Sequence, residues 1–404
     1  MTKLEQLIKD LCPDGVEYKT LGEMGEFFGG ITGKSKQDFK DGNAKFITYK
    51  NVYSNITVDL STDDKVKIAQ NENQRTLQYG DICFTGSSET PDECGFSSVV
   101  VEKPTEPTYL NSFCFFYRLN DKEIFDPHFL KYVFRSHDLR LQIGKTASGV
   151  TRFNVSKALM KKVKIPIPPL EVQREIVKYL DNFTELMAEL TAELTARKKQ
   201  YEYYRDMLLD FGTVHGGGAS DCEWRTLKEV CSISAGGDVP KESFSKDKTD
   251  IFNIPIISNG IGDNALYGYT SIEKVTEPAV TVAARGTIGY AEYRDYPYYP
   301  IIRLLSVIPK EKDCLNTKYL YYVLQRQHYD VPKTGIPQLT SPMIQKVSIP
   351  IPSIEEQTRI VNILDRFDKL CNDISEGLPA EIEARRKQYE YYRDKLLSFE
   401  EVRM

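Results

Sequence analysis

The chain has 404 residues, of which 41% are hydrophobic and 27% charged, and its net charge is −5. This length allows two or more domains with separate cores, and the composition is ordinary for a globular protein. No apolar run is long enough to cross a membrane, and the start of the chain lacks the features of a signal peptide, so we expect a cytoplasmic protein. Its eight cysteines and four histidines show no metal-ligand spacing, which favours reduced structural thiols and no bound metal.

The chain begins with a predicted amphipathic helix over residues 1–11. From there to residue 164 the sequence is typical of a mixed α/β domain with short strands. Val99–Val101 and Phe113–Tyr117 are predicted strands, and Leu130–Phe134 is a predicted helix late in this domain.

Basic residues concentrate between positions 131 and 164, opposed only by Asp138, although the whole chain is acidic. A local stripe of positive charge matters more for phosphate binding than net charge, so this stretch suggests nucleic acid. A solvated helix face would give the same pattern. The stripe consists of Lys131, Arg135, Arg140, Lys145, Arg152, Lys157, Lys161, Lys162 and Lys164.

Residues 165–211 form the first of two predicted long helices. Their apolar residues follow one another in alternating steps of four and three, which is the heptad pattern of a coiled-coil seam. At 1.5 Å per residue, about 40 residues make a rod of roughly 60 Å. Arg197 is the one charged member of this seam, which comprises Ile176, Leu180, Phe183, Met187, Leu190, Leu194, Arg197, Tyr201, Tyr204, Leu208 and Phe211.

The glycine-rich residues 212–221 are a predicted flexible linker. A second domain of the same mixed class follows over residues 222–348, and its opening Glu223–Leu227 matches Glu17–Leu21 of the first. Within it, Ile301–Ile308 is a predicted strand and Leu320–Leu324 a predicted helix.

Residues 349–404 contain the second predicted long helix. The offset between the two halves grows by four residues within this segment, which is a stutter in the heptad pattern. Gly377 and Pro379 lie at the same place and predict a kink or a break. The seam comprises Ile360, Leu364, Phe367, Cys371, Ile374, Leu378, Ile382, Arg385, Tyr389, Tyr392, Leu396 and Phe399.

The two halves of the chain repeat one another, because Lys199–Asp206 recurs letter for letter as Lys387–Asp394. We therefore predict an α+β protein with two mixed α/β domains alternating with two long helices, arranged about a pseudo-twofold axis. Two seams in one chain favour an antiparallel intramolecular coiled coil, although each helix could instead lie on its own domain. The repeated tyrosines fall on the seam, which favours packing over base stacking.

Several segments resemble catalytic motifs without fulfilling them. Gly29–Ser35 is similar to a phosphate-binding loop, but Phe28 stands where the first glycine is needed. Asp126–Phe129 is similar to the Asp-Pro-Pro-Tyr/Phe motif of amino-methyltransferases, but His128 replaces the second proline. The lack of a convincing catalytic site favours a binding or architectural role.

The duplicated plan resembles the specificity subunit of type I restriction–modification systems. The resemblance covers essentially the whole chain and is carried by the two helix starts and by the two tyrosine-rich ends. Thr191–Leu194 is similar to the family's central four-residue repeat, and Arg285–Gly289 to a turn of its target-recognition domains. The first half departs from that turn and has Thr85-Gly-Ser-Ser88 instead. The helix starts read Ile165-Pro-Ile-Pro168 with Glu171-Val-Gln173 and Ile176-Val177, and Ile349-Pro-Ile-Pro352 with Glu355-Glu-Gln357 and Ile360-Val361.

The resemblance implies a non-catalytic, DNA-binding subunit. Each domain would recognise one half of a split, asymmetric double-stranded DNA site, and the paired helices would set the gap between the halves. The chain would bind no cofactor and would join two methyltransferase subunits, which carry S-adenosylmethionine and modify adenine, and restriction subunits, which bring ATP, Mg²⁺ and cleavage.

For DNA contacts, the predicted positions lie in late loops of the two domains. Gly149–Arg152 and Gly335–Gln338 hold equivalent places, and arginine can read guanine and glutamine adenine in a bidentate way. Arg140, Lys145 and Lys333 suit phosphates. Surface solvation or a turn hydrogen bond is the alternative for each. The predicted DNA-binding residues are Arg140, Lys145, Arg152, Arg285, Lys333 and Gln338.

Two other functional classes remain open from the sequence. A coiled-coil scaffold without DNA binding could dimerise through the same seams, but the basic stretch and the two dissimilar domains count against it. A solitary modification enzyme would need cofactor and catalytic motifs that we do not find.

Overall fold

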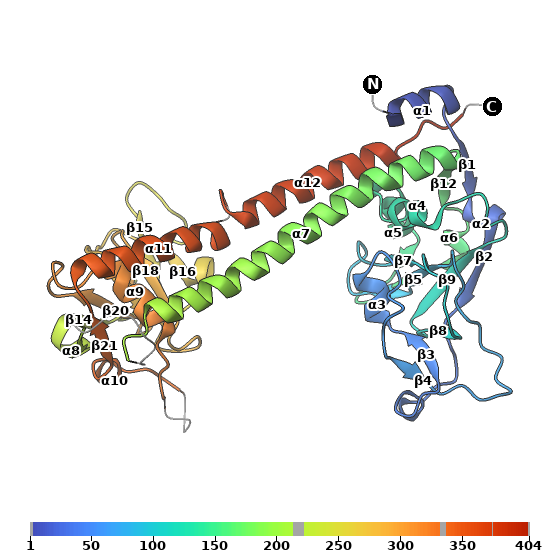
Figure 1. Cartoon of the computed structure of the whole chain (residues 1–404). Coiled ribbons are helices and arrows are strands. Elements are labelled where there is room, and N and C mark those ends of the chain that lie inside the picture. The colour runs from blue at the N-terminus through green and yellow to red at the C-terminus, as the bar shows by residue number, and fades with distance from the viewer. Residues whose placement is uncertain (1–2, 213–221, 332–336, 374, 403–404) are drawn as a thin grey trace. The chain divides into compact units, whose positions relative to one another are not determined.

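The computed structural model describes residues 3–212, 222–331, 337–373 and 375–402 (Figure 1). The chain folds into two compact units. The first, unit 1, consists of Met1–Leu190 and Ile382–Met404, and the second, unit 2, of Thr191–Glu381. One long helix, α7 (Leu170–Leu208), therefore contributes its first half to unit 1 and its second half to unit 2. Each unit combines mainly antiparallel sheets with helices, which confirms the predicted α+β class.

The core of unit 1 is a four-stranded antiparallel sheet whose inner strands are buried on both faces. Phe84, Phe115 and Tyr117 pack toward the helices, while Cys83 and Phe116 pack toward a smaller sheet. This alternation follows from the two-residue period of a strand. The sheet has the order β2 (Gly25–Gly29), β9 (Cys114–Leu119), β5 (Ile82–Thr85) and β7 (Ser97–Val99).

Three smaller sheets complete unit 1. In the first, β3 and β8 run parallel, and in the second a hairpin is joined by a strand that follows β5. The third is a two-stranded ribbon that brings the start of the domain to the start of α7. Their strands are β4 (Lys65–Val66), β3 (Ala44–Ile47) and β8 (Thr108–Leu110); β10 (Ala147–Ser148), β11 (Phe153–Val155) and β6 (Ser87–Ser88); and β1 (Glu17–Thr20) with β12 (Lys164–Ile167).

The helices of unit 1 begin with the predicted N-terminal helix, which the structure confirms as α1 (Lys3–Leu11). The predicted helix near Leu130 is confirmed as α4 (Pro127–Val133), which begins at the cap Asp126. The remaining helices are α2 (Leu21–Met24), η1 (Lys36–Phe39), α3 (Tyr49–Ser54), α5 (His137–Gly144), α6 (Lys157–Met160) and most of α12 (Leu378–Leu397).

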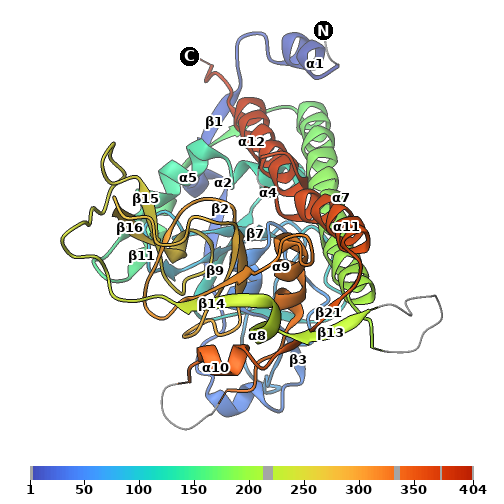
Figure 2. The same cartoon turned by 90° about the vertical axis from the view of Figure 1, so that its left-hand side faces the viewer.

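Unit 2 repeats the strand order of unit 1 in three sheets. Figure 2 shows the first ribbon strand leading through a short helix into the main sheet. The described residues of unit 2 contain no counterpart of the β10-β11-β6 sheet. The three sheets are β14 (Cys231–Ala235), β20 (Leu305–Pro309), β17 (Ala279–Val282) and β18 (Ala291–Arg294); β16 (Leu266–Thr270), β15 (Ile254–Ile257) and β19 (Tyr299–Pro300); and β13 (Glu223–Thr226) with β21 (Ser348–Ile351).

The helices of unit 2 include the predicted helix near Leu320, confirmed as α9 (Thr317–Arg326). The predicted interruption of the second long helix is also confirmed, because α11 (Ile354–Asn372) ends before Gly377 and α12 begins after it. A Cβ atom on Gly377 would lie 2.6 Å from the Lys369 carbonyl oxygen, so the connection requires glycine. The short helices are α8 (Leu227–Val230), η2 (Gly262–Ala265) and α10 (Ser341–Ile344).

A buried glutamine fastens each long helix to its domain. The side chain of Gln173 accepts a hydrogen bond from the Asp126 amide at 2.9 Å, and it donates to the carbonyls of Ile124 and Pro168 at 2.9 and 2.8 Å. Gln357 makes the same three bonds in unit 2 at 2.9, 2.9 and 2.8 Å. The repeated glutamine therefore fixes the start of a long helix against the start of the preceding helix.

A second fastening lies two turns further along each long helix. Asp181 accepts hydrogen bonds from Lys131 at 2.7 Å and from the Tyr132 hydroxyl at 2.5 Å. Asp365 repeats this arrangement with Tyr322 at 2.6 Å and with a lysine one turn earlier on α9. Burial and the neighbouring carboxylate raise the pKa of Tyr132 and of Tyr322 well above the usual range.

Inside each unit, aromatic seam residues bring two helical segments together. In unit 1, Phe183 of α7 stacks on Tyr392 of α12 with ring centroids 5.6 Å apart. In unit 2, Tyr204 of α7 stacks on Phe367 of α11 at 5.6 Å. Leu180, Leu190, Tyr201 and Leu364 are buried, whereas Leu194 and Tyr389 are half-buried and pack against the unit cores. The predicted seam residue Ile374 lies outside the described residues.

The last described residues complete unit 1. Val16 donates its amide to the Glu400 carbonyl at 2.8 Å and accepts from the Val402 amide at 3.1 Å. The Tyr18 hydroxyl donates to the Phe399 carbonyl at 2.9 Å. Residues 16–18 and residues 399–402 consequently lie side by side.

Candidate nucleic-acid interface

In unit 1, the predicted late loop is the tip of the β10–β11 hairpin. Gly149 has a φ of +151°, and a Cβ there would lie 2.0 Å from the Arg152 carbonyl oxygen, so the tight tip requires glycine. The Arg152 Nε donates to the Ser87 Oγ at 3.0 Å, and the guanidinium lies 5.8 Å from the ring centre of Phe113. Val150 at the tip is 92% exposed. The hairpin thus holds a cation and an apolar side chain toward solvent.

In unit 2, the corresponding edge carries a different pair. Arg285 donates from Nε and Nη2 to the Oε1 of Gln338, at 3.1 and 2.7 Å. Gly286, with a φ of +70°, forms the turn that follows. The structure therefore brings together two residues that the sequence predicted separately, and both are half-buried.

Backbone hydrogen bonds define which residues of the two units correspond. Val155 donates to the Gly86 carbonyl, and Leu339 donates to the Ala284 carbonyl, at 3.0 and 2.9 Å. Gln338 therefore takes the place of Asn154, not that of Arg152. The predicted equivalence of Gly149–Arg152 and Gly335–Gln338 is wrong by two residues, because sequence alone offers no register where the loops share little. By the same alignment, Arg285 replaces Ser87 of unit 1.

One asparagine joins three loops at this edge of unit 2. Asn259 donates from Nδ2 to the Ile302 carbonyl at 2.6 Å, and its Oδ1 accepts from the Ala284 amide at 2.8 Å. Its own carbonyl accepts from the Thr287 hydroxyl at 2.9 Å. The loop that contains Arg285 is consequently held in place from two sides. Asn259 was not predicted from the sequence, since an asparagine before a glycine is common in turns.

The basic stretch is partly internal. Arg140 donates to the carbonyls of Asp92, Cys94 and Gly95, each at 2.7 Å, and burial lowers its pKa to about 10. Arg135 donates to a carbonyl of β7, and Lys131 pairs with the long helix. The spacing of charges did not predict these structural contacts. Lys145 and the lysines of residues 157–162 are exposed, while Lys333 lies outside the described residues.

The structure corrects one predicted strand at this edge. Ile301–Ile308 is not continuous, because Ile302 and Arg303 have positive φ values of 52° and 64° and form a turn before β20 begins. The apolar run concealed the turn, which contains no glycine, proline or asparagine. Phe113 likewise lies in the turn before β9 rather than in the strand, and it is 60% exposed.

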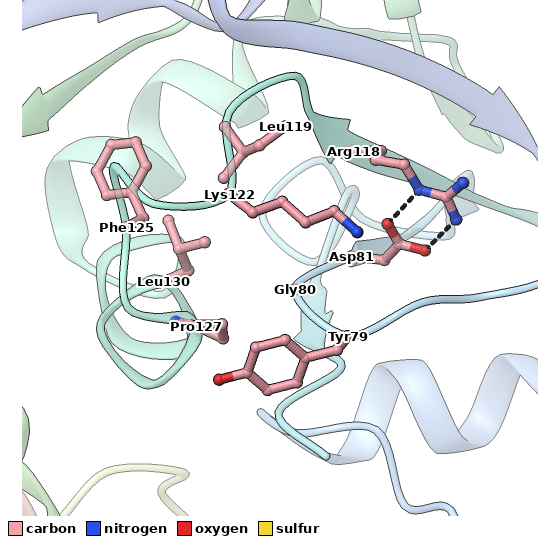
Figure 3. Close-up of a pocket in the computed structure, with 9 residues that line it drawn as sticks. All are labelled: Tyr79, Gly80, Asp81, Arg118, Leu119, Lys122, Phe125, Pro127 and Leu130. Carbon is pink, nitrogen blue, oxygen red and sulfur yellow. Dashed lines mark hydrogen bonds and ion pairs between the residues drawn. The ribbon is translucent and has the colours of Figure 1, made fainter. Parts of the chain in front are cut away.

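A pocket in unit 1 is lined by polar residues, as a small-molecule site would be, but its volume is too small for a ligand (Figure 3). Asp81 accepts from Arg118 at 2.7 and 2.6 Å, and Lys122 points toward this pair. Burial raises the pKa of Asp81 against the opposing effect of Arg118. The volume of about 20 Å³ holds little more than one water molecule. We regard this ion pair as structural.

Across the described residues, no three His, Cys, Asp or Glu side chains are grouped so that they could hold a metal ion. A search of the same residues for a helix with the length and apolar character of a membrane span finds none.

Comparison with known proteins identifies the family. The family described as type I restriction modification DNA specificity domain matches residues 13–197 and 219–384. The chain belongs to this family. It is 34% identical over 304 residues to the type I specificity subunit S.MpnORF89P of Mycoplasma pneumoniae, covering 72% of this chain and 87% of that protein. It is also 38% identical over 276 residues to the EcoR124I/EcoR124II specificity subunit of Escherichia coli, covering 61% and 65%.

Solved structures share the fold. The S subunit of a type I system from M. genitalium aligns with a TM-score of 0.54 and 14% identity, over 95% of this chain and 96% of that one. The HsdS subunit from Thermoanaerobacter tengcongensis aligns with a TM-score of 0.51 and 19% identity, over 96% of each chain. A chain from a study of complex assembly in the type I R-M system gives 0.63 and 18%, over 95% and 98%.

Proposed function

We propose that this chain is the DNA-specificity subunit of a type I restriction–modification complex, and that each unit recognises one half of an interrupted, asymmetric site. One observation carries the proposal. The two units repeat the same strand order, yet corresponding positions at one edge differ, with Ser87 against Arg285 and Asn154 against Gln338. A common scaffold that carries different polar side chains suits the recognition of two different DNA sequences.

The proposed contacts use the chemistry of base edges in the major groove. Among the described residues, Arg152 is fixed through Nε, which leaves its two terminal nitrogens for the O6 and N7 of a guanine. In unit 2, Arg285 and Gln338 act as a joined pair in which Gln338 retains its amide donors. Lys145 is exposed beside the hairpin and suits a phosphate. Arg140 has its donors engaged internally and is not among these proposed contacts.

For the helices, we propose an antiparallel pair in which α7 faces α12 and α11 along one seam, with pseudo-twofold symmetry. The contacts between Phe183 and Tyr392 and between Tyr204 and Phe367 support this pairing within each unit. The pair would set the number of unspecified base pairs between the half-sites. Two readers on one face of the duplex lie about 34 Å apart, which a helix of this length can span.

We further propose that the repeated tyrosine-rich segment docks two copies of one partner, the methyltransferase subunit. Tyr203 and Tyr391 occupy the same position in the two repeats and are 65% and 62% exposed. Each ring packs edge-on against the next tyrosine along the chain and remains largely exposed, so the identity of these side chains in both halves suits a shared partner surface. The chain itself would be non-catalytic. S-adenosylmethionine, ATP and Mg²⁺ would belong to the methyltransferase and restriction subunits of a cytoplasmic complex.

The test is to purify the chain with its methyltransferase subunit, treat unmethylated genomic DNA, and map the modified adenines. We expect one motif with two defined parts separated by a fixed gap. Methylation without a motif, or a motif of one continuous part, would contradict the proposal. Association without any DNA preference would indicate a scaffold instead.

A further inference from the structure

Two neighbouring residues of unit 2 have a backbone conformation that the sequence does not explain. Ile302 and Arg303 are the only non-glycine residues with positive φ in the part of the chain that the structure describes. A β-branched side chain in this region is a rare and unfavourable arrangement. Strain of this kind persists where the surroundings impose it, and it concentrates at functional sites.

The surroundings of this turn do impose it. The Ile302 amide donates to the Gly237 carbonyl at 2.9 Å, and the Arg303 amide donates to the Gly236 carbonyl at 3.2 Å. Asn259 holds the Ile302 carbonyl at 2.6 Å. The backbone is therefore fixed on three sides. The Ile302 side chain, by contrast, is 46% exposed, and Arg303 is also exposed.

Unit 1 has a large apolar side chain in the same turn. The Gly30 amide donates to the Cys114 carbonyl, as the Gly236 amide donates to that of Leu304, which aligns the turn before β9 with the turn before β20. Phe113 occupies this turn in unit 1 and is 60% exposed. In this register Phe113 corresponds to Arg303 and Ile302 to Ser112. Both units thus present an apolar side chain to solvent from the same turn, at adjacent positions, although the core does not need it.

Both turns adjoin the residues proposed to contact DNA. Phe113 lies against the guanidinium of Arg152, and Asn259 connects the Ile302 carbonyl to the loop that carries Arg285. An apolar side chain beside polar DNA-contacting residues can pack against a thymine methyl group, which is the apolar feature of a base edge in the major groove. The strain at Ile302 would then be retained because the strained turn directs the Ile302 side chain toward the base pairs.

We propose that Phe113 and Ile302 are apolar base contacts that help to determine specificity, one in each half of the DNA site. The inference rests on the proposed function and adds these two residues to it. In the bound complex each side chain packs against base pairs of its own half-site, beside Arg152 in one case and beside Arg285 in the other.

The experiment uses the complex with the methyltransferase subunit and maps methylated motifs for Phe113→Ala and Ile302→Asn. Asparagine tolerates positive φ, so the second variant keeps the turn and removes the apolar group. We expect F113A to relax one position of the first half-site by about tenfold, and I302N one position of the second. Each variant serves as the control for the other, since the opposite half-site must stay unchanged. Leu141→Ala, on an exposed face of α5, should leave the motif intact.

The outcomes are distinguishable. If the wild-type complex yields no bipartite motif, the proposed function fails. If the wild-type motif is bipartite and neither variant alters it, only the present inference fails. A variant that abolishes methylation supports the inference if the complex no longer prefers its site over unrelated DNA, and overturns it if that preference is unchanged. If I302N raises the melting temperature and leaves the motif unaltered, the strain at Ile302 has no role in DNA recognition.

Discussion

Arg285 directs two of its guanidinium nitrogens at a single oxygen atom of Gln338. The two residues are 53 positions apart and come from different loops. Their pairing fixes both side chains before any ligand arrives, and preorganised side chains lose less conformational entropy on binding. A substitution of either residue would remove these hydrogen bonds and release the other side chain from its position.

Gln338→Glu tests this pair. The new carboxylate would form an ion pair with Arg285 and would place a negative charge where DNA is proposed to bind. We expect binding to the cognate site to weaken by about 1–3 kcal/mol, with reading of the first half-site unchanged. Titration of labelled duplex at several salt concentrations measures the loss. Gln338→Ala removes the amide without adding charge, and an equal loss for both variants would argue against the electrostatic explanation.

Tyr203→Ala and Tyr391→Ala test the docking of methyltransferase subunits. Both side chains are largely exposed, so we expect little change in the melting temperature. Each single variant should bind one methyltransferase subunit in place of two, and the double variant should bind none at the same protein concentration. Native mass spectrometry reads this stoichiometry directly. Tyr267→Ala, at a tyrosine that is 49% exposed elsewhere in unit 2, is the matched control.

Lengthening the central helix tests its role as a spacer. Duplicating the segment Thr191–Leu194 adds about 6 Å of helix. We expect the unspecified gap in the methylated motif to grow while both half-sites keep their sequences. Sequencing of modified DNA from cells that carry the altered chain decides this. An unchanged gap would mean that the helix does not set the spacing.

Gln173→Ala and Gln357→Ala test the two helix anchors. Each change leaves a buried backbone amide and two carbonyls without partners, so we expect a loss of about 2–4 kcal/mol in unfolding free energy. Hydrogen exchange should show the loss locally, around α4 for the first variant and around α9 for the second. Gln37→Ala, at an exposed glutamine, should change little. Equal effects on both units would contradict separate anchoring.

At the starts of α2 and α8, a glutamate accepts hydrogen bonds from the amide and the hydroxyl of the threonine three residues earlier. These two capping boxes predict that the protein loses stability in acid. Hydrogen bonds from Thr20 and Thr226 lower the pKa of Glu23 and of Glu229 below the ordinary value. Stability from a depressed carboxyl pKa is present above the unfolded value near 4.3 and is lost as the pH falls through the folded value. Unfolding free energies measured between pH 6 and pH 3 should therefore fall less steeply for the double variant E23Q/E229Q. An identical slope would assign the acid sensitivity to other groups.

Sequence reasoning succeeded where a residue's role depends on its neighbours along the chain. The helix break follows from Gly377 and Pro379, which no regular helix accommodates, and the long helices follow from apolar periodicity. The sequence indicates only that Gln173 and Gln357 are repeated, and the structure shows that each one anchors a long helix to its domain. These features are local, so the identity and spacing of a few residues suffice to indicate them.

The failures concern residues whose surroundings come from distant parts of the chain. Arg140 resembles a phosphate ligand by charge, yet three carbonyls of a loop about 45 residues earlier engage it. The Ile302 turn is imposed by Gly236, Gly237 and Asn259, none of which is adjacent in sequence. The correspondence between loop residues of the two repeats also became clear only from backbone hydrogen bonds. Tertiary contacts overrode local preference in each case.

The hydrogen bonds of Val16 with Glu400 and Val402 bear on the order of events during synthesis. Unit 2 is continuous in sequence, whereas unit 1 needs a segment that is translated after unit 2. At typical elongation rates, about 200 residues separate its two parts by on the order of 10–40 s. The half that is translated first should therefore mature second, and until then it would expose an unfinished apolar surface to chaperones and proteases.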